Sequence, residues 1–191
     1  RNKILEILRK KKFKYAAFID DDCILDRNWL SSMTQMMKYS KADVITGPQY
    51  TKSNNILLKI MERNYAHAKK VKWASTNNVF FKSNLVNNKV NFSKKLNNIG
   101  GEDQLYFLEH YRTGKVFYWN SHAPVYEIND PKRENLYWFL RRNLRYGASS
   151  IMIYRVLYGK LSGNFIILIK FIKDLTNLFF YLIKSLFLSK K

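Results

Sequence analysis

A short apolar run that ends in three consecutive aspartates constrains this chain more than any other feature of its sequence. Residues 15–19 read YAAFI, and Asp20, Asp21 and Asp22 follow them directly. An apolar run of this length predicts a buried β-strand. Open α/β sheets bind their ligands beyond the carboxyl ends of their strands. The three carboxylates are therefore expected where such a sheet would bind its ligand.

The rest of the chain alternates between helical and strand-like patterns. Apolar residues recur at helical spacing over residues 4–8, 29–39, 56–69 and 102–112. Strand-like runs cover residues 42–46, 74–81, 116–119 and 124–128, and residues 84–98 are expected to form a polar loop. Alternating strands and helices predict an α/β architecture with a mixed, largely parallel sheet flanked by helices.

Asp20 and Asp22 are candidates for holding a metal ion. Side chains two apart in an extended segment point the same way, so these two carboxylates can converge on one cation. Hard cations such as Mg²⁺ or Mn²⁺ prefer oxygen ligands, and a bound ion would in turn hold a diphosphate. The alternative is a solvated acidic turn that caps the helix expected after Asp26.

A second acidic cluster is Gly100-Gly101-Glu102-Asp103. The glycines permit unusual backbone angles and the close approach of a ligand, and the two acids open the next helix. Either acid could serve as a general base. Acids at a helix N-terminus are also ordinary capping residues. The cluster indicates a catalytic site only in combination with the three aspartates upstream.

Seven short motifs resemble, in their order and spacing, those of the family-2 glycosyltransferases. They are Arg1-Asn2, Phe18-Ile19-Asp20-Asp21-Asp22, Trp29-Leu30, Gly47-Pro48, Asn77-Asn78, Gly101-Glu102-Asp103 and Val125-Tyr126-Glu127. The resemblance covers residues 1–150 and implies a GT-A fold, with residues 1–135 as the C-terminal part of the catalytic domain. It also implies that the first strands, which hold the base of the donor, precede Arg1.

The same resemblance assigns roles to particular residues. It implies that Asp20 and Asp22 hold Mn²⁺ or Mg²⁺ and the diphosphate of a nucleotide-sugar donor, with Glu127 where many relatives have a metal-binding histidine. Asp103 would be the general base on the acceptor, and Glu102 would orient the acceptor hydroxyl in an inverting displacement. Further donor contacts are implied for Asp21, Asn77, Asn78, Gly101, Arg141, Arg142 and Arg145.

The C-terminal segment, residues 136–191, combines basic and apolar residues. The chain has 34 Lys and Arg against 14 Asp and Glu, and residues 131–191 hold twelve of the former against two of the latter. This asymmetry suits contact with anionic lipid or nucleic acid, although compositional drift is an alternative explanation of the total charge. For residues 136–147, the alternatives are contact with donor diphosphate or membrane, nucleic-acid binding, and a solvated basic face.

Residues 165–188 carry one polar stripe in a dense apolar background, which predicts an amphipathic helix. Their longest charge-free stretch is nine residues, whereas a spanning helix needs about 20, so we expect the helix to lie in the membrane interface. Packing on the protein's own core is the alternative.

Cysteine and histidine contribute little to these expectations. The single Cys23 excludes a disulfide framework and a multi-cysteine zinc site, and it fits a reducing compartment. Because His67, His110 and His122 are isolated in the sequence, we expect them at the surface or in satisfied packing.

Together these features predict a membrane-associated, metal-dependent, inverting glycosyltransferase. We expect it on the cytoplasmic, inner face of a bacterial membrane, in polysaccharide biosynthesis, with a cell-surface or lipid-linked glycan as acceptor and no nucleic-acid partner. The alternative is a non-catalytic basic protein that binds membrane or nucleic acid and whose acidic clusters only cap helices. A third hypothesis is that this chain is inactive by itself.

Overall fold

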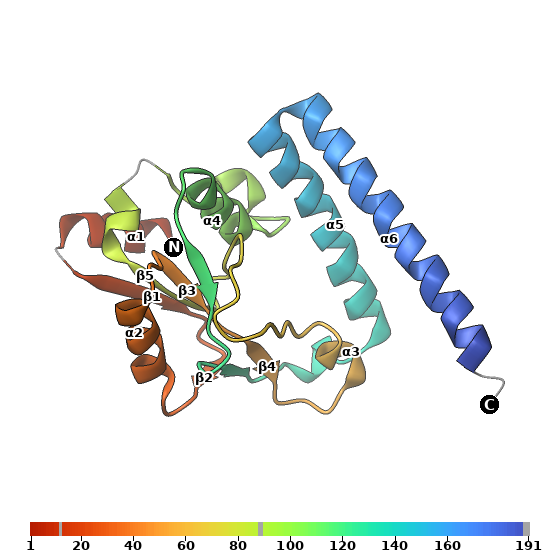
Figure 1. Cartoon of the computed structure of the whole chain (residues 1–191), viewed down its shortest axis with the longest axis horizontal. Helices are drawn as coiled ribbons and strands as arrows, with labels where there is room; N and C mark the ends of the chain where they lie inside the picture. The colour runs from red at the N-terminus through yellow and green to blue at the C-terminus, as the bar shows by residue number, and fades with distance from the viewer. Residues whose placement is uncertain (12, 88–89, 189–191) are drawn as a thin grey trace.

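Two β-sheets with flanking helices form an α/β body, and two long helices stand beside it (Figure 1). The computed structural model describes residues 1–11, 13–87 and 90–188, with side chains described as far as residue 177 except that of residue 87. The helices are α1 (Asn2–Lys10), α2 (Trp29–Tyr39), α3 (Ile56–Lys59), α4 (Glu102–Arg112), α5 (Leu136–Tyr158) and α6 (Lys160–Leu188).

Both sheets contain parallel and antiparallel pairs. The strands are β1 (Tyr15–Ile19), β2 (Cys23–Leu25), β3 (Val44–Thr46), β4 (Gln49–Thr51), β5 (Asn78–Lys82), β6 (Phe117–Trp119) and β7 (Val125–Glu127). One sheet has the order β1-β5-β3-β6 and the other β2-β7-β4. The predicted α/β class and mixed sheet are confirmed. The strands are not largely parallel, however, because β5 runs antiparallel to both β1 and β3, and β2 antiparallel to β7.

Helices cover both faces of the four-stranded sheet. On one face, Leu5 of α1 and Phe107 of α4 pack against Phe81 of β5. On the other face, Trp29 and Met33 of α2 belong to a separate buried cluster. Apolar side chains alternate between the two faces of a strand, so this arrangement buries β5 completely except at its last residue. The four-stranded sheet is therefore packed between helices, and the residues at its strand ends extend from this packed core.

Several sequence-based element predictions are confirmed and others are wrong. The strand over residues 15–19 and the helix over residues 102–112 form as predicted. The helix predicted over residues 56–69 ends at Lys59, because the later part of that segment pairs with the edge strand β6, where Ala68 N donates to Trp119 O. The short strands β2 and β4 were not predicted.

The segment predicted as a polar loop, residues 84–98, contributes to the core. It contains 3₁₀ helices over Ser83–Asn87 and Lys94–Leu96. Leu85, Val86 and Phe92 are buried in the cluster that also contains Leu5 and Phe107. Residues 88–89 of this segment lie outside the described residues.

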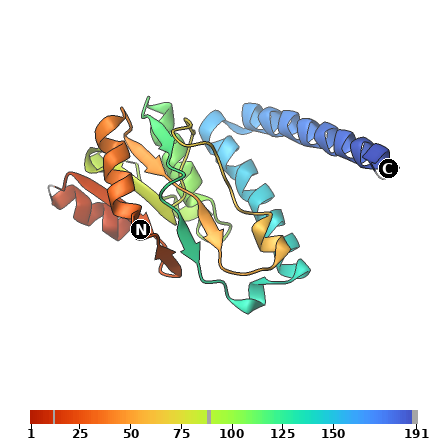
Figure 2. The same ribbon diagram turned by 60° about the horizontal axis from the view of Figure 1, so that its bottom comes forward.

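Helices α5 and α6 form an antiparallel hairpin, and α6 extends beyond the sheets (Figure 2). Ile153 and Leu157 of α5 pack on Leu105 of α4, which attaches the hairpin to the body. A Cβ at Gly163 would lie 2.8 Å from the backbone of α5, so glycine allows this close approach. None of the described helices has the combination of length and apolar character that crossing a bilayer requires.

Candidate functional site

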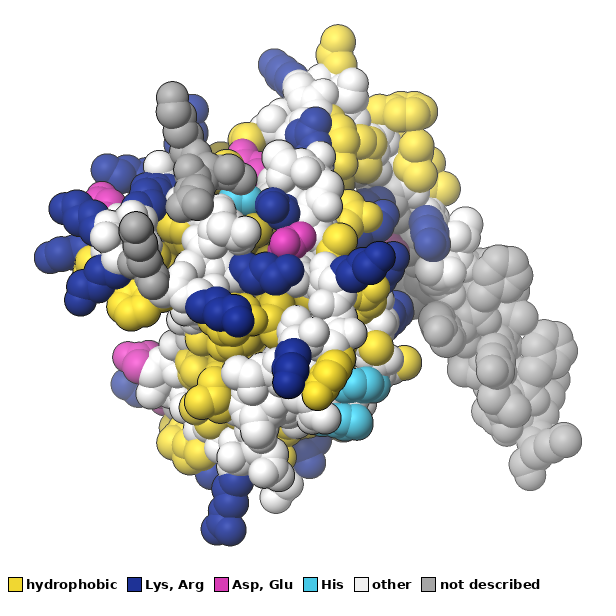
Figure 3. Space-filling model, turned by 60° about the vertical axis from the view of Figure 1, so that its left-hand side comes forward, with side chains coloured by type: hydrophobic (Ala, Val, Ile, Leu, Met, Phe, Trp, Pro, Cys, Tyr) yellow, Lys and Arg dark blue, Asp and Glu magenta, His cyan; other side chains and the backbone are white. Residues whose placement is uncertain are grey.

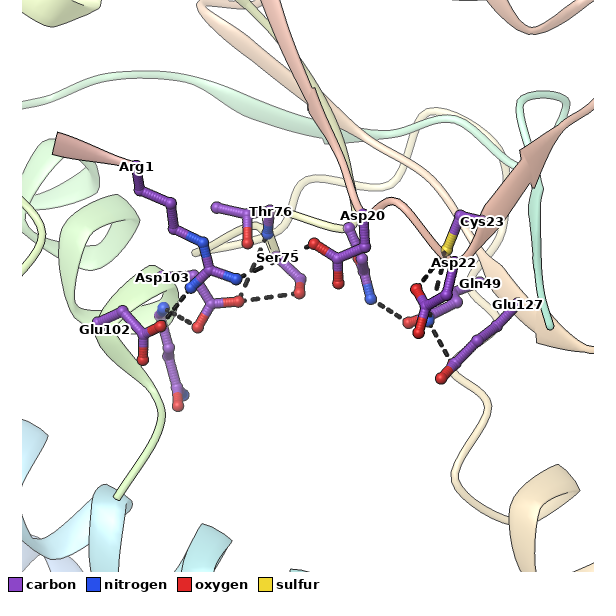
Figure 4. Close-up of polar contacts among 12 residues, drawn as sticks. Arg1, Asp20, Asp22, Cys23, Gln49, Ser75, Thr76, Glu102, Asp103 and Glu127 are labelled. Carbon is purple, nitrogen blue, oxygen red and sulfur yellow. Dashed lines mark hydrogen bonds and ion pairs between the residues drawn. The ribbon is translucent and has the colours of Figure 1, made fainter. Parts of the chain in front are cut away.

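A cavity of about 1130 Å³ opens between the ends of the sheets and helix α5. Its lining includes five of the acidic side chains selected in the sequence, namely Asp20, Asp22, Glu102, Asp103 and Glu127. They come from three places: the end of β1, the first turn of α4 and the end of β7. Figure 4 shows them in one row, with Asp103 and Glu127 near its opposite ends and Asp20 between them.

Arg1 connects two of these acidic positions. Its guanidinium forms an ion pair with Glu102 and a longer one with Asp20, where Nη2 lies 3.9 Å from Oδ1. The first residue of the chain therefore links the end of β1 to the start of α4 (Figure 4).

Asp103 is held in one orientation by hydrogen bonds to both carboxylate oxygens. Ser75 Oγ donates to Oδ2 over 2.9 Å, and Thr76 N donates to the same oxygen over 3.4 Å. The backbone N–H of Gln104 donates to Oδ1 over 2.7 Å. A carboxylate oriented in this way beside a cavity suits proton abstraction from a bound hydroxyl.

Arg133 lies between two carboxylates at the other end of the row. Its Nη1 is 2.9 Å from Glu127 Oε1 and 3.6 Å from Asp22 Oδ2. Gln49 Nε2 donates to the second oxygen of Glu127 over 2.6 Å, and Asn77 donates to Gln49. Both oxygens of Glu127 therefore have a donor.

Burial and crowding raise the pKa of two of these acids. Burial raises the pKa of Asp20, Arg1 opposes the shift, and the charges of Asp22 and Asp103 add to it. Burial and the charge of Asp22 raise the pKa of Glu127, against the opposing effect of Arg133. Placing these carboxylates together costs free energy, which a bound cation would offset.

The acids at this end of the row carry the type of donor atom that a hard cation takes, although they are not gathered around a common point. Among the described residues, no group of three or more His, Cys, Asp or Glu side chains is arranged so that it could hold a metal ion. The carboxylates of Asp20, Asp22 and Glu127 nevertheless interact electrostatically and supply only oxygen, which Mg²⁺ and Mn²⁺ prefer. Arg133 supplies positive charge between Asp22 and Glu127.

Three residues predicted to contact the donor do not line the cavity. Asp21 and Arg141 are exposed and outside its lining. Asn78 is fully buried, and its Oδ1 accepts a 2.8 Å hydrogen bond from Trp29 Nε1. The Asn78 amide nitrogen donates to the carbonyls of Pro48 and Ala123, 2.9 Å from each. Asn78 thus connects α2 to two loops, whereas its neighbour Asn77 lines the cavity.

Helix α5 supplies the wall opposite the sheets. Arg142 and Arg145 line the cavity, as do Trp138 and Tyr146. The Arg142 guanidinium lies 5.0 Å from the ring centre of Trp138 and 5.3 Å from that of Tyr146, and its Nε donates to the Tyr146 hydroxyl over 2.7 Å. Arg142 also opposes the upward shift in the pKa of Glu127, so the cation acts on the acidic row.

Gly101 brings α4 close to α5. It caps the N-terminus of α4 with φ 90°, in the left-handed region that favours glycine. A Cβ there would lie 3.0 Å from Ile153 Cδ1 and 3.2 Å from Ser149 Cβ. Glycine at this position therefore allows the first turn of α4, with Glu102 and Asp103, to lie beside α5.

Four residues of this network were not predicted from the sequence: Gln49, Ser75, Thr76 and Arg133. Ser75 and Thr76 directly precede Asn77-Asn78, which is a local signal for their place in the site. Gln49 directly follows Gly47-Pro48, which is a similar local signal. Arg133 had no such signal, since it lies in a turn after β7 that only the tertiary fold brings to Glu127.

The sequence matches no protein-family model and no curated protein. The structure resembles S. aureus TarS 1–349 in complex with UDP at TM-score 0.53 and 15% identity, over 81% of this chain and 43% of that chain. For the complex with UDP-GlcNAc, the TM-score is 0.53 and the identity 13%, over 78% of this chain and 43% of that chain. A197 from STIV aligns at TM-score 0.46 and 19% identity, over 68% of this chain and 66% of that one. The chain thus spans less than half of TarS 1–349, and the likeness supports the glycosyltransferase-like, GT-A type of fold predicted.

Proposed function

We propose that this chain carries the reaction site of a glycosyltransferase that moves a sugar from a nucleoside-diphosphate donor to an acceptor hydroxyl. The observation that carries the proposal is the row of carboxylates from Asp103 to Glu127 in one cavity. Support comes from the fold, which resembles that of a protein solved with UDP and with UDP-GlcNAc. The cavity combines acids for metal and proton chemistry with arginines suited to phosphate.

Asp103 is the proposed general base. It takes the proton of the acceptor hydroxyl while that oxygen attacks the anomeric carbon, and the bond to the donor diphosphate breaks on the opposite side. A single displacement of this kind inverts the anomeric configuration. Its hydrogen bonds from Ser75 and Thr76 fix the carboxylate for this role, and Glu102 beside it orients the hydroxyl.

The other end of the row is the proposed donor end. Asp20, Asp22 and Glu127 would hold Mn²⁺ or Mg²⁺, which when bound stabilises negative charge on the departing diphosphate. Arg142 and Arg145 on α5 face the same cavity and can donate to phosphate oxygens. In this proposal the diphosphate binds between the acids at the ends of the sheets, through the metal ion, and the arginines of α5.

The proposed location is the cytoplasmic face of a membrane, with a glycan or lipid-linked glycan as acceptor. Large apolar side chains along α6 are exposed, among them Leu161 at 85% and Phe165 at 64%. Lys170 and Lys173 lie on the same helix, which suits contact with anionic lipid. Flotation with anionic vesicles tests this: we expect binding that is lost when residues 160–191 are removed, and no flotation of the whole chain would refute it.

A transfer assay tests the enzymatic proposal. Purified protein is incubated with Mn²⁺ and a panel of nucleotide sugars, and release of the nucleoside diphosphate is measured. Asp103→Asn should lower the rate by about 10²–10⁴-fold, which is the usual contribution of a general base. Asp26→Asn is the matched control, since the Asp26 carboxylate accepts from the backbone N–H of Asn28 before α2 and does not line the cavity. No release from any donor, or equal rates for both variants, would contradict the proposal.

A further inference from the structure

A basic segment, residues 63–72, lines the cavity beside the acidic row. Arg63, Lys69, Lys70 and Lys72 all contribute to the lining. Within the described part of the chain none of these four side chains forms an ion pair, whereas Arg1 and Arg133 are both paired with acids of the row. Arg63 and Lys69 instead stack on the rings of Trp73 and Tyr65, so acids of the described residues do not neutralise the four positive charges.

Backbone hydrogen bonds attach this basic segment to β6. Ala68 N donates to Trp119 O over 2.9 Å, Trp119 N donates to Lys69 O over 2.8 Å, and Val71 N donates to Phe117 O over 3.1 Å. Ala68 itself has φ 60°, a left-handed conformation that residues other than glycine seldom adopt. Strain of this kind persists where the surrounding structure imposes it, and it is frequent at binding sites.

The segment leads directly to the general-base end of the row. Three residues after Lys72 comes Ser75, whose hydroxyl holds Asp103. The ring of Trp73 between them lies under the Arg63 guanidinium, 4.3 Å from ring centre to Cζ. Lys72 is therefore separated by only two residues from the serine that orients Asp103.

Like charges gathered along a cavity repel one another, and a ligand of opposite charge relieves that repulsion. We propose that the basic segment binds the acceptor and that the acceptor carries phosphate or carboxylate groups. This inference rests on the proposed function, because it names the substrate class for the site around Asp103. The rings of Trp73 and Tyr65 lie against the Arg63 guanidinium and the Lys69 ammonium and hold these two cations beside the cavity.

The test compares two triple variants with the same change in net charge. Lys69→Gln/Lys70→Gln/Lys72→Gln removes the lysines of the basic segment. Lys3→Gln/Lys10→Gln/Lys41→Gln removes three exposed lysines that do not line the cavity. Glucose 6-phosphate, glucuronate and glucose are titrated into each protein by calorimetry. Stabilisation by nucleoside diphosphates with Mn²⁺ is measured in parallel as a readout of the donor end.

We expect the wild type and the control variant to bind the charged sugars and not glucose. The basic-segment variant should bind them about tenfold more weakly, as expected for the loss of several exposed ion pairs. Its response to nucleotide and Mn²⁺ should be unchanged. A preference for glucose 6-phosphate or for glucuronate identifies which anionic group is recognised.

Four outcomes would overturn this inference. They are equal binding of glucose, no binding of either charged sugar, equal weakening in the control variant, and loss of the nucleotide response in the basic-segment variant. If the segment instead captures phosphatidylglycerol vesicles and no charged sugar, it is a lipid contact. A normal nucleotide response alongside any of the first three outcomes leaves the proposed function standing without the anionic acceptor.

Discussion

Ser75 Oγ donates a 2.9 Å hydrogen bond to Oδ2 of Asp103 and so joins the segment before β5 to the first turn of α4. The two residues are far apart in the sequence, and the contact orients the proposed base toward the cavity. Through this contact Ser75 should affect the rate of transfer without affecting the binding of the donor.

Ser75→Ala should slow sugar transfer by about tenfold, because one hydrogen bond from a hydroxyl to the Asp103 carboxylate is lost while two backbone donors remain. Stabilisation by nucleotide and Mn²⁺ should not change. Steady-state rates and melting temperatures measure the two effects. Ser31→Ala, on the exposed side of α2, is the control, and a rate for Ser75→Ala equal to that of this control would exclude the positioning role.

Arg133→Gln should lower stability at neutral pH by about 1 kcal/mol, since Asp22 and Glu127 then face each other without the intervening guanidinium. Added Mn²⁺ should raise the melting temperature of this variant more than that of the wild type, because the ion replaces the lost positive charge. Thermal unfolding with and without Mn²⁺ measures both effects. Arg27→Gln serves as control, and an identical response of the two variants to Mn²⁺ would argue against a cation at this end.

Asp20→Asn should stabilise the protein at pH 7. Burial raises the pKa of this carboxyl, so the folded state binds the proton more tightly than the unfolded state does. The wild type therefore loses stability as pH rises through the window that begins near the ordinary carboxyl pKa of about 4. Urea unfolding at pH 7 and at pH 3.5 should show a gain that vanishes at the lower pH. A loss of stability at pH 7 would mean that the pairing with Arg1 outweighs the burial.

His110→Phe should make the protein less sensitive to acid. His110 is fully buried, and among the described residues neither of its ring nitrogens has a hydrogen-bond partner. Burial lowers its pKa from 6.5 to about 4, so the wild type loses up to about 3 kcal/mol as pH falls between these values. Urea unfolding at pH 7 and pH 4.5 should show a smaller difference in the variant than in the wild type. The exposed His122→Phe is the control, and the same pH dependence in all three proteins would refute the assignment.

Local sequence signals predicted the elements that position the row of carboxylates. The apolar run before Asp20 and the two glycines before Glu102 each define a structure within a few residues, so β1 and α4 were predictable. The segment over residues 60–69 was not, because its backbone pairing with β6 outweighs its helical periodicity.

Contacts between distant residues were outside the reach of the sequence. Arg133 reaches Glu127 and Asp22 from a turn with no motif of its own. Asn77 and Asn78 are alike in sequence, yet one lines the cavity and the other is buried beneath Trp29. His67 and His122, isolated in the chain, stack with ring centres 4.2 Å apart. In each case the tertiary fold, and not the local sequence, sets the surroundings of these residues.

Metal-dependent binding of a diphosphate tests the central claim most directly. Melting temperatures are measured with UDP, GDP, CDP, dTDP and inorganic pyrophosphate, each with and without Mn²⁺, for the wild type, Asp22→Asn and the Asp26→Asn control. We predict that at least one of these ligands stabilises the wild type and the control by several degrees, about what a ligand at 100 times its Kd provides, and only with Mn²⁺. Asp22→Asn should not respond. No response from the wild type to any ligand, or an undiminished response from Asp22→Asn, would contradict the account.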